Sequence, residues 1–201
     1  MGALAFALQT AQLPSDRCAD DDRTLQAGPG ALTYTTDPLE RDTVVAGPIA
    51  ARIYATSNRP NVELVATIED VSPDGTSTPL STGALLGSFR ELDRNLTWRA
   101  PGGNPIAPYH PYTRSSVKPV TPGLLTRYDI EIFPTLAELA AGHRLRLTLT
   151  TSDSPHLLPS PAQATQLVGG VYQVQRNIGA ASHLEIPLAR PDSFHACSLC
   201  K

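Results

Sequence analysis

The chain has 201 residues, of which 41% are hydrophobic and 17% are charged, and its formal net charge is −3. This composition is too apolar for a disordered chain, and no unbroken apolar run of about 18 residues predicts a membrane-spanning helix. No basic stripe supports binding to nucleic acid. The 19 prolines and 14 glycines argue against a helical bundle and favour short strands joined by turns.

The first 31 residues differ in composition from the rest of the chain. Residues 1–13 are mildly apolar, but they lack the positive region that precedes the apolar core of a secretory signal. They predict a weak helix or the end of an upstream segment. Residues 14–31 are polar, acidic and rich in turn formers. We therefore interpret 1–31 as a linker or the remnant of an upstream region.

From Leu32 the sequence alternates between apolar and polar residues in short segments. The clearest is His143–Thr151, in which Leu145, Leu147 and Leu149 share one face. The same period of two appears at 49–56, 62–69, 127–132 and 184–188. Because successive side chains of a strand point to opposite faces, each segment can cover one side of a shared core. The pattern predicts an all-β fold over 32–190, a jelly-roll β-sandwich resembling galactose-binding domains.

Turn formers separate these segments. Ser72–Gly75 (SPDG) predicts a tight turn, and residues 101–122 predict a long proline-rich loop. The one short helical segment we expect inside the domain is Thr135–Ala141, ended by Gly142.

The three cysteines lie at the two ends of the chain. Cys197 and Cys200 form a C-x-x-C in a C-terminal tail, 191–201, and Cys18 lies near the start. The motif favours a structural disulfide, between Cys197 and Cys200 or between Cys18 and one of them, with one thiol left over. Reduced thiols remain an alternative, and a zinc site with His195 would lack a convincing fourth ligand.

The sequence predicts no catalytic residue, no metal and no cofactor. It contains no G-x-S-x-G, no phosphate loop, no dinucleotide fingerprint and no H-E-x-x-H. His143 is expected to make a structural hydrogen bond at the start of its strand. Asp153–His156 (DSPH) is expected to form a turn, because the members of a catalytic triad are rarely neighbours in sequence.

One group of side chains suggests a contact surface. Trp98, Tyr109, His110 and Tyr112 lie on or beside the long loop. They predict a docking or ligand surface, either a platform on which sugar rings stack or a loop packed on a neighbouring domain.

Short blocks of sequence follow one another in a recognisable order: 47–49, Ile68–Gly75, Leu80–Gly83, Gly87–Arg90, Asp129–Thr135 and Ala141–Leu147. In this order and spacing they resemble the C-terminal domain of X-Pro dipeptidyl-peptidases and of cocaine-esterase-like hydrolases. The resemblance covers about residues 32–190. Residues 109–114 and 169–175 resemble blocks of an exported actinobacterial subgroup.

The resemblance implies a non-catalytic jelly roll that packs on an α/β-hydrolase domain and shapes the entrance to its active site. In the family, that partner carries a Ser-Asp-His triad and cleaves esters or amides, in the peptidases after an X-Pro dipeptide. No position of this chain matches the triad, so no catalytic residue is carried over and the chain alone is expected to be inactive. We expect it to be the last part of a longer enzyme.

Two alternatives stay open at this point. The chain could be a free-standing module that binds carbohydrate or cell-wall polymer, or its docking surface could be reused in a homodimer. The resemblance implies export of the parent protein, whereas the missing signal-peptide charge leaves a cytoplasmic location open.

Overall fold

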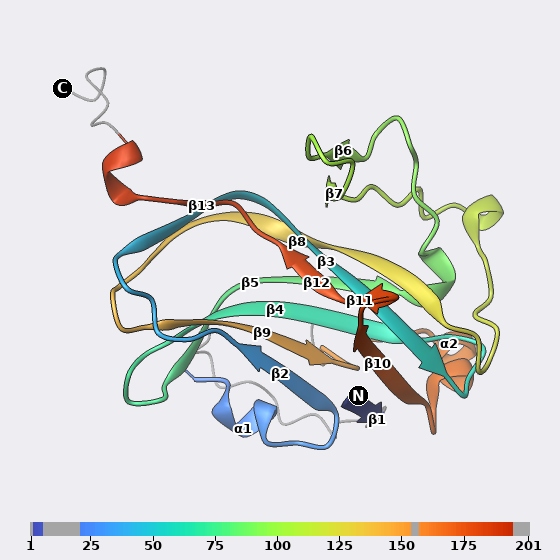
Figure 1. The fold of residues 1–201 in the computed structure, drawn as a ribbon. Coiled ribbons are helices and arrows are strands. Elements are labelled where there is room, and N and C mark those ends of the chain that lie inside the picture. Colours follow the sequence, from blue (N-terminus) through green and yellow to red (C-terminus); the bar gives the residue numbers. More distant parts are fainter. Residues whose placement is uncertain (1, 6–20, 154–156, 195–201) are drawn as a thin grey trace.

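The computed structural model describes residues 2–5, 21–153 and 157–194, and these form two packed layers of antiparallel strands (Figure 1). The first layer contains β1 (Gly2–Ala5), β3 (Thr43–Ser57), β8 (Thr126–Leu139), β10 (Val171–Asn177), β11 (Ala180–Ala181), β12 (His183–Glu185) and β13 (Leu188–Ala189). The second contains β2 (Ala31–Thr35), β4 (Glu63–Val71), β5 (Ser77–Leu86) and β9 (Arg144–Thr150), in the order β2-β9-β4-β5. The predicted all-β sandwich is confirmed.

Shorter elements lie outside these layers. A two-stranded ribbon is made by β6 (Trp98–Arg99) and β7 (Pro105–Ala107), and it projects from the sandwich in Figure 1. The helices are α1 (Arg23–Gln26) and α2 (Pro161–Leu167), with 3-10 turns at Gly87–Phe89, Arg114–Ser116 and Pro191–Ser193. Within the described residues no helix is long and apolar enough to cross a membrane.

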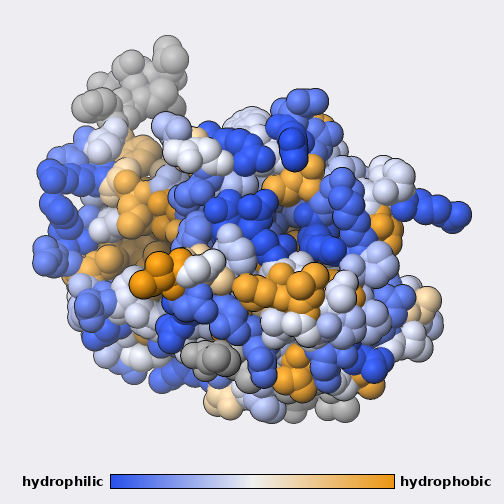
Figure 2. Space-filling model, turned by 45° about the vertical axis from the view of Figure 1, so that its right-hand side comes forward, coloured by the Kyte–Doolittle hydropathy of each residue, from blue (hydrophilic) through white to orange (hydrophobic). Residues whose placement is uncertain are grey.

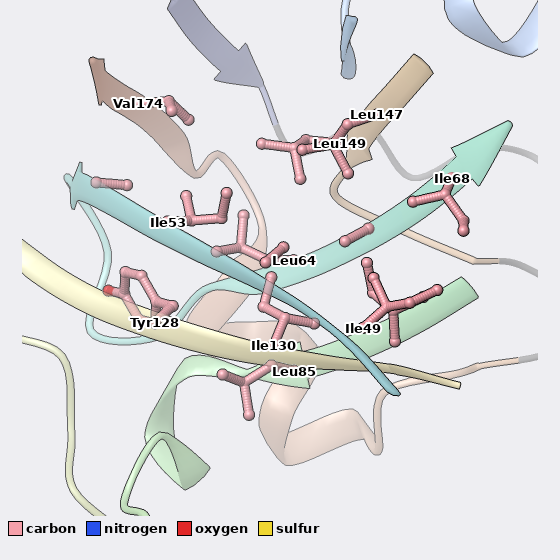
Figure 3. Close-up of a cluster of buried hydrophobic side chains, with 14 of the residues drawn as sticks. Ile49, Ile53, Leu64, Ile68, Leu85, Tyr128, Ile130, Leu147, Leu149 and Val174 are labelled. Atoms are coloured by element: carbon pink, nitrogen blue, oxygen red, sulfur yellow. The ribbon is translucent and has the colours of Figure 1, made fainter. Parts of the chain in front are cut away.

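The core lies between the two sheets, where the predicted apolar faces meet (Figure 3). Ile49 and Ile53 of β3 and Ile130 of β8 come from one sheet, and Ile68 of β4 and Leu149 of β9 come from the other. All five are at most 1% exposed. Removing a side chain of this size from water stabilises the fold by about 1.5–3 kcal/mol, so this face determines which side of each strand points inward.

The predicted helix over Thr135–Ala141 is wrong, because most of that segment belongs to β8. Thr135 lies opposite Gly47 of β3 and Leu139 lies opposite Thr43, with a register shift at Gly47/Ile49. Along the segment Leu136 and Glu138 are exposed while Leu139 is buried, which is the period of a strand. Pairing with β3 therefore overrides the helix propensity of TLAELAA. Gly142, with φ +83°, serves the turn into β9 instead of capping a helix.

The N-terminal segment Gly2–Ala5 forms a strand, so the weak-helix alternative is wrong for these four residues, and the rest of 1–13 lies outside the described residues. β1 pairs antiparallel with β10, with Gly2 opposite Val174 and Ala5 opposite Val171. The pairing extends the first sheet by one strand. Residues 21–31, in the predicted linker, include α1, and Asp22 N donates to Ser77 O at 2.9 Å.

Two further local predictions are confirmed. In the Ser72–Gly75 turn, Gly75 has φ +91° and its N–H donates to Ser72 O at 2.9 Å. His143 makes the expected structural contact, with Nδ1 2.8 Å from Asp70 Oδ1 on the neighbouring strand β4.

The two sheets touch directly where β5 passes β8. A Cβ added to Gly83 would lie 1.8 Å from the carbonyl oxygen of Glu131. Ser81 Oγ donates to the carbonyl oxygen of Phe133 at 2.6 Å, which ties the same two strands. Gly83 is therefore required by this close approach of two backbones.

Candidate docking surface

A long excursion of the chain leaves the sandwich after β5 and returns before β8. Its base is closed by Arg90, whose guanidinium donates to the carbonyl oxygens of Gly87, Lys118 and Pro119. Lys118 N donates to Ser88 O at 2.8 Å, and the Lys118 ammonium lies 2.9 Å from Glu91 Oε1. The two ends of the excursion are thus held together, and residues between them form a defined loop.

The Gly87–Arg90 block that contributed to the family resemblance has a physical role at this base. A Cβ on Gly87 would lie 2.4 Å from Val62 Cγ2 and 2.9 Å from Tyr128 Cε1, so no larger residue fits. Ser88 N donates to Asn61 Oδ1 at 2.9 Å, and Asn61 Nδ2 donates to Ser88 Oγ at 3.1 Å. The block therefore attaches the loop to the sandwich.

A polar network anchors the ribbon to the outer face of the first sheet. Arg52 of β3 donates from Nε to Asp129 Oδ1 of β8 at 2.8 Å and from a terminal nitrogen to Asn104 Oδ1 at 3.1 Å. Asn104 Nδ2 in turn donates to Glu185 Oε1 of β12 at 2.5 Å. Arg127 Nε lies 2.9 Å from Asp129 Oδ2. Asn104, next to β7, thus bridges the loop to two strands.

His110 lies beneath this loop and is only 3% exposed. Its Nδ1 lies 3.0 Å from the carbonyl oxygen of Glu91, and its Nε2 lies 2.8 Å from the carbonyl oxygen of Asp129. These contacts join the start of the loop to β8. His110 is a positioning residue of the loop, and its ring is not part of an exposed surface.

The ribbon presents an apolar face to solvent, which we name the ribbon face: Leu96, Trp98 and Tyr109. Their exposed fractions are 53%, 67% and 45%. Trp98 lies opposite Ala107 in the β6–β7 pair, and Leu96 lies in the turn that precedes β6. Tyr109 N also donates to Thr97 Oγ1 at 3.1 Å. The three exposed side chains thus belong to the ribbon and to the two segments that flank it.

Tyr112 is separated from the ribbon face by backbone geometry. It has φ +51°, an uncommon conformation for a residue other than glycine. Its ring lies 5.6 Å from that of Phe89 and 5.7 Å from that of His110. It is 57% exposed and lies at the edge of a groove described next.

This groove runs beside the edge strand β5 and has a volume of about 550 Å³. We name it the Glu63 groove, after the acidic side chain in its lining. Its lining includes apolar side chains of the loop, of β5, of β8 and of the segment before α2: Tyr112, Leu85, Leu86, Phe133, Leu157, Leu158 and Pro159. Phe133 and Leu158 are 71% and 74% exposed. The groove is therefore mostly apolar and open to solvent.

Glu63 is the unusual residue of this groove. It is 7% exposed, and burial together with the nearby Asp153 raises its pKa to about 7. Among the described residues no hydrogen bond or ion pair satisfies its carboxyl group.

The sequence prediction of a four-residue surface is therefore only partly matched by the geometry. Trp98 and Tyr109 are exposed on and beside the ribbon, Tyr112 lies at the edge of the Glu63 groove, and His110 is buried. Leu96, Arg90 and Asp129 were not singled out from the sequence. The exposure of Leu96 and the partners of Arg90 and Asp129 depend on strand register and on the path of the loop.

The cysteine predictions concern residues that the structure does not describe. Cys18, Cys197 and Cys200 lie outside the described residues, as do His195 and part of Asp153–His156. In the parts of the chain that the structure does describe, no cluster of three or more His, Cys, Asp or Glu side chains could hold a metal ion.

The antiparallel sandwich and its projecting loop define the class of the protein as a β-sandwich accessory domain. The chain belongs to the family of X-Pro dipeptidyl-peptidase C-terminal non-catalytic domains, whose sequence model matches residues 5–175. The resemblance inferred from the sequence blocks is thus confirmed.

Two curated relatives are much longer than this chain. A Mycobacterium bovis protein that is named as a serine esterase is 27% identical over 160 residues, which are 80% of this chain and 24% of that protein. The cocaine esterase of a Rhodococcus species is 21% identical over 178 residues, 85% of this chain and 27% of the esterase. The chain spans about a quarter of the length of these relatives.

Solved structures show the same fold at low sequence identity. An aminopeptidase from a marine sediment archaeon of the Thaumarchaeota has a TM-score of 0.66 at 22% identity, over 86% of this chain and 28% of that one. An α-amino acid ester hydrolase has a TM-score of 0.67 at 18% identity, with the same coverage. A hydrolase of the CocE/NonD family from Staphylococcus aureus has a TM-score of 0.64 at 17% identity and covers 80% of this chain and 30% of its own.

Proposed function

We propose that this chain packs on an α/β-hydrolase catalytic domain and helps to shape the entrance to its active site. The single observation that carries the proposal is the ribbon face, an apolar patch displayed on a tightly anchored loop of a non-catalytic family member. Exposed aromatic rings of this kind mark interaction surfaces, and Trp and Tyr dominate the binding energy of many interfaces.

The anchoring supports a docking role because it reduces the entropy cost of association. Arg90 closes the base of the loop, and Arg52 and Asn104 hold its ribbon on the sheet. A preordered surface loses little conformational freedom when a partner binds. Figure 2 shows several separate apolar patches among hydrophilic residues on the face it draws. Because the loop projects from the sandwich, its exposed side chains can contact a partner while other faces of the sandwich stay in water.

The partner's chemistry is proposed from the relatives. Proteins named as esterases, an ester hydrolase and an aminopeptidase share this fold, and a catalytic domain of that group would cleave an ester or amide. In this proposal the triad lies entirely in the partner, and the present chain contributes a wall of the entrance. Export of the assembled protein is part of the same proposal and rests on the family resemblance alone.

The only tryptophan of the chain provides a direct test. The chain is produced with 5-fluorotryptophan and mixed with the unlabelled catalytic portion of the Mycobacterium bovis relative. We expect the fluorine resonance of Trp98 to shift as a complex forms by size-exclusion chromatography. Leu96→Ser and Tyr109→Ser should weaken the complex, while Ile178→Ser, at a fully exposed apolar residue between β10 and β11, should not.

Two outcomes would contradict this assignment. A complex that leaves the Trp98 resonance unmoved would mean that docking uses another surface. A resonance that shifts with the concentration of this chain alone would indicate a homodimer through the ribbon face.

The second candidate function is a carbohydrate-binding module, which the exposure of Trp98 and Tyr109 on a sandwich scaffold also favours. Flat exposed rings can stack on the apolar faces of sugars. Retardation of the chain in gels containing cell-wall polymer, lost in Trp98→Ala and kept in Ile178→Ser, would support it. Unchanged mobility across a panel of polymers would count against it.

A further inference from the structure

The Glu63 groove contains an acidic side chain that the fold leaves uncompensated. The other two buried carboxylates of the described residues each have close partners: Asp129 contacts two arginines, and Oε2 of Glu69 accepts from three neutral donors while its Oε1 has none. Glu63 has neither, although it is only 7% exposed. Burying a carboxyl group without a partner costs free energy, so such a group in a natural fold calls for an explanation.

We propose that the Glu63 groove binds a small organic cation, a primary ammonium group carried by an aromatic or branched aliphatic body. The ammonium group would pair with Glu63, and the body would lie between Phe133, Leu158 and Tyr112. The site is separate from the ribbon face, and the inference does not depend on the proposed docking function.

The charge of the groove favours a cation over other ligands. The described residues of its lining include Glu63 and no Lys, Arg or His. An ammonium group supplies three donors as a compact point charge, and a carboxylate in a site of low dielectric attracts it more strongly than one in water. A metal ion fits poorly, because hard cations need several oxygen ligands and the walls are apolar.

The size and walls of the groove favour a small amphipathic molecule. Its volume of about 550 Å³ lies within the range of pockets that hold drug-sized ligands, roughly 300–1,000 Å³. The exposed side chains Phe133 and Leu158 would lose water contact when an apolar body enters. Their burial would supply the hydrophobic part of the affinity, and Glu63 would orient the charged end.

The test uses two probes with the same ring and opposite charge, 2-phenylethylamine and phenylacetate, titrated into the full chain by calorimetry at about pH 8. We expect the amine to bind at least about tenfold more tightly than the acid. Glu63→Gln should weaken amine binding by about tenfold or more, and Leu158→Ser should weaken both probes. Glu138→Gln, at an exposed carboxylate of β8, is the matched control and should bind as the wild type does.

The pH dependence gives a second readout. Because the pKa of Glu63 is raised to about 7, the group is mostly protonated near pH 6, and amine affinity should fall there. Asp153 helps to raise the pKa of Glu63, and Glu63 in turn helps to raise the pKa of the buried Tyr172. In Glu63→Gln the affinity should no longer depend on pH over this range.

Three results would overturn the proposal. These are equal affinity for the two probes, unchanged amine affinity in Glu63→Gln, and no heat of binding for the amine at about 10 mM, tenfold above a weak Kd of about 1 mM. Chemical shifts of the backbone amides in Leu158→Ser would show whether that variant keeps its fold, so loss of binding there can be assigned to the groove.

Discussion

Asp129 and Glu69 are buried carboxylates on the outer faces of the two sheets, and they have different partners. Asp129 is 4% exposed and lies 2.8 Å from Arg52 and 2.9 Å from Arg127. Glu69 is fully buried, and one of its oxygens accepts from Gln26, Ser77 and Thr148, all neutral. Burial raises the pKa of Glu69 because no cation offsets it.

The difference separates two kinds of surface. On the first sheet, ion pairing holds a long loop in place and lets it display apolar residues to solvent. On the second sheet, Gln26 covers the outer face, donating to Glu69 and Ser77 and accepting from Arg146, and Glu63 is left unpaired beside an open groove. The ion pairs of Asp129 thus anchor the projecting ribbon, a surface whose shape suits a large partner. The unpaired carboxyl of Glu63 lies in the concave groove, whose shape suits a small ligand.

The largest loss of stability should come from a substitution at the contact between β5 and β8, where the two sheets touch. Gly83→Ala places a Cβ against the carbonyl oxygen of Glu131, 1.8 Å away, so β5 and β8 must separate. We expect a loss of about 4 kcal/mol in the free energy of unfolding, measured by urea titration. Gly102→Ala, where nothing lies within 4 Å, is the control and should change stability little. Equal losses in both variants would contradict the close approach.

Breaking the ion pair between Arg52 and Asp129 should have the next largest effect on stability. Arg52→Leu leaves Asp129 buried with Arg127 alone and removes the contact with Asn104. The free energy of unfolding should fall by about 3 kcal/mol, and amide exchange around Asn104 should accelerate. Arg127→Leu should cost less, because the Arg127 side chain is 48% exposed. The reverse order would mean that Arg52 is not the main partner of Asp129.

The carboxyl of Glu63 should make stability depend on pH. Its pKa is raised from 4.5 to about 7 in the folded state, so the folded protein binds more protons than the unfolded chain between these values. The contribution of Glu63 to the free energy of unfolding should therefore be fully present below pH 4.5 and be lost, about 3 kcal/mol in all, as pH rises through 7.

Glu63→Gln should remove this part of the slope and leave the contribution of the same sign that the raised pKa of Glu69 produces. Urea titrations at several pH values would measure both. An unchanged slope in the variant would show that Glu63 is not the group responsible.

The smallest effect on stability should come from the ribbon face. Trp98→Ser removes a side chain that is 67% exposed, so the free energy of unfolding should change by no more than about 0.5 kcal/mol. The same substitution should abolish docking if the proposed function holds. A large loss of stability would show that Trp98 contributes to the fold instead of serving as a contact residue.

Much of the fold could be predicted from sequence because its signal is local. Ile49, Ile53 and Ile130 are buried where the alternation placed them, and Ser72–Gly75 forms its turn. The failure at Thr135–Ala141 has a clear cause: a short segment with helix propensity gains more by pairing with β3. The candidate surface was predicted less well, because the exposure of Trp98 and the burial of His110 depend on the path of the loop.

The sequence by itself determined an apolar, weakly charged β-sandwich of the X-Pro dipeptidyl-peptidase C-terminal family, since strand alternation, turn residues and ordered blocks can all be recognised along the chain. Only the tertiary structure decided that Arg52 meets Asp129, that Gly83 meets Glu131 and that Glu63 is left unpaired beside a groove. The first two contacts join residues about 50 or more positions apart, and strand register sets them. The exposure of Glu63 depends on which side chains cover β4, and packing sets it.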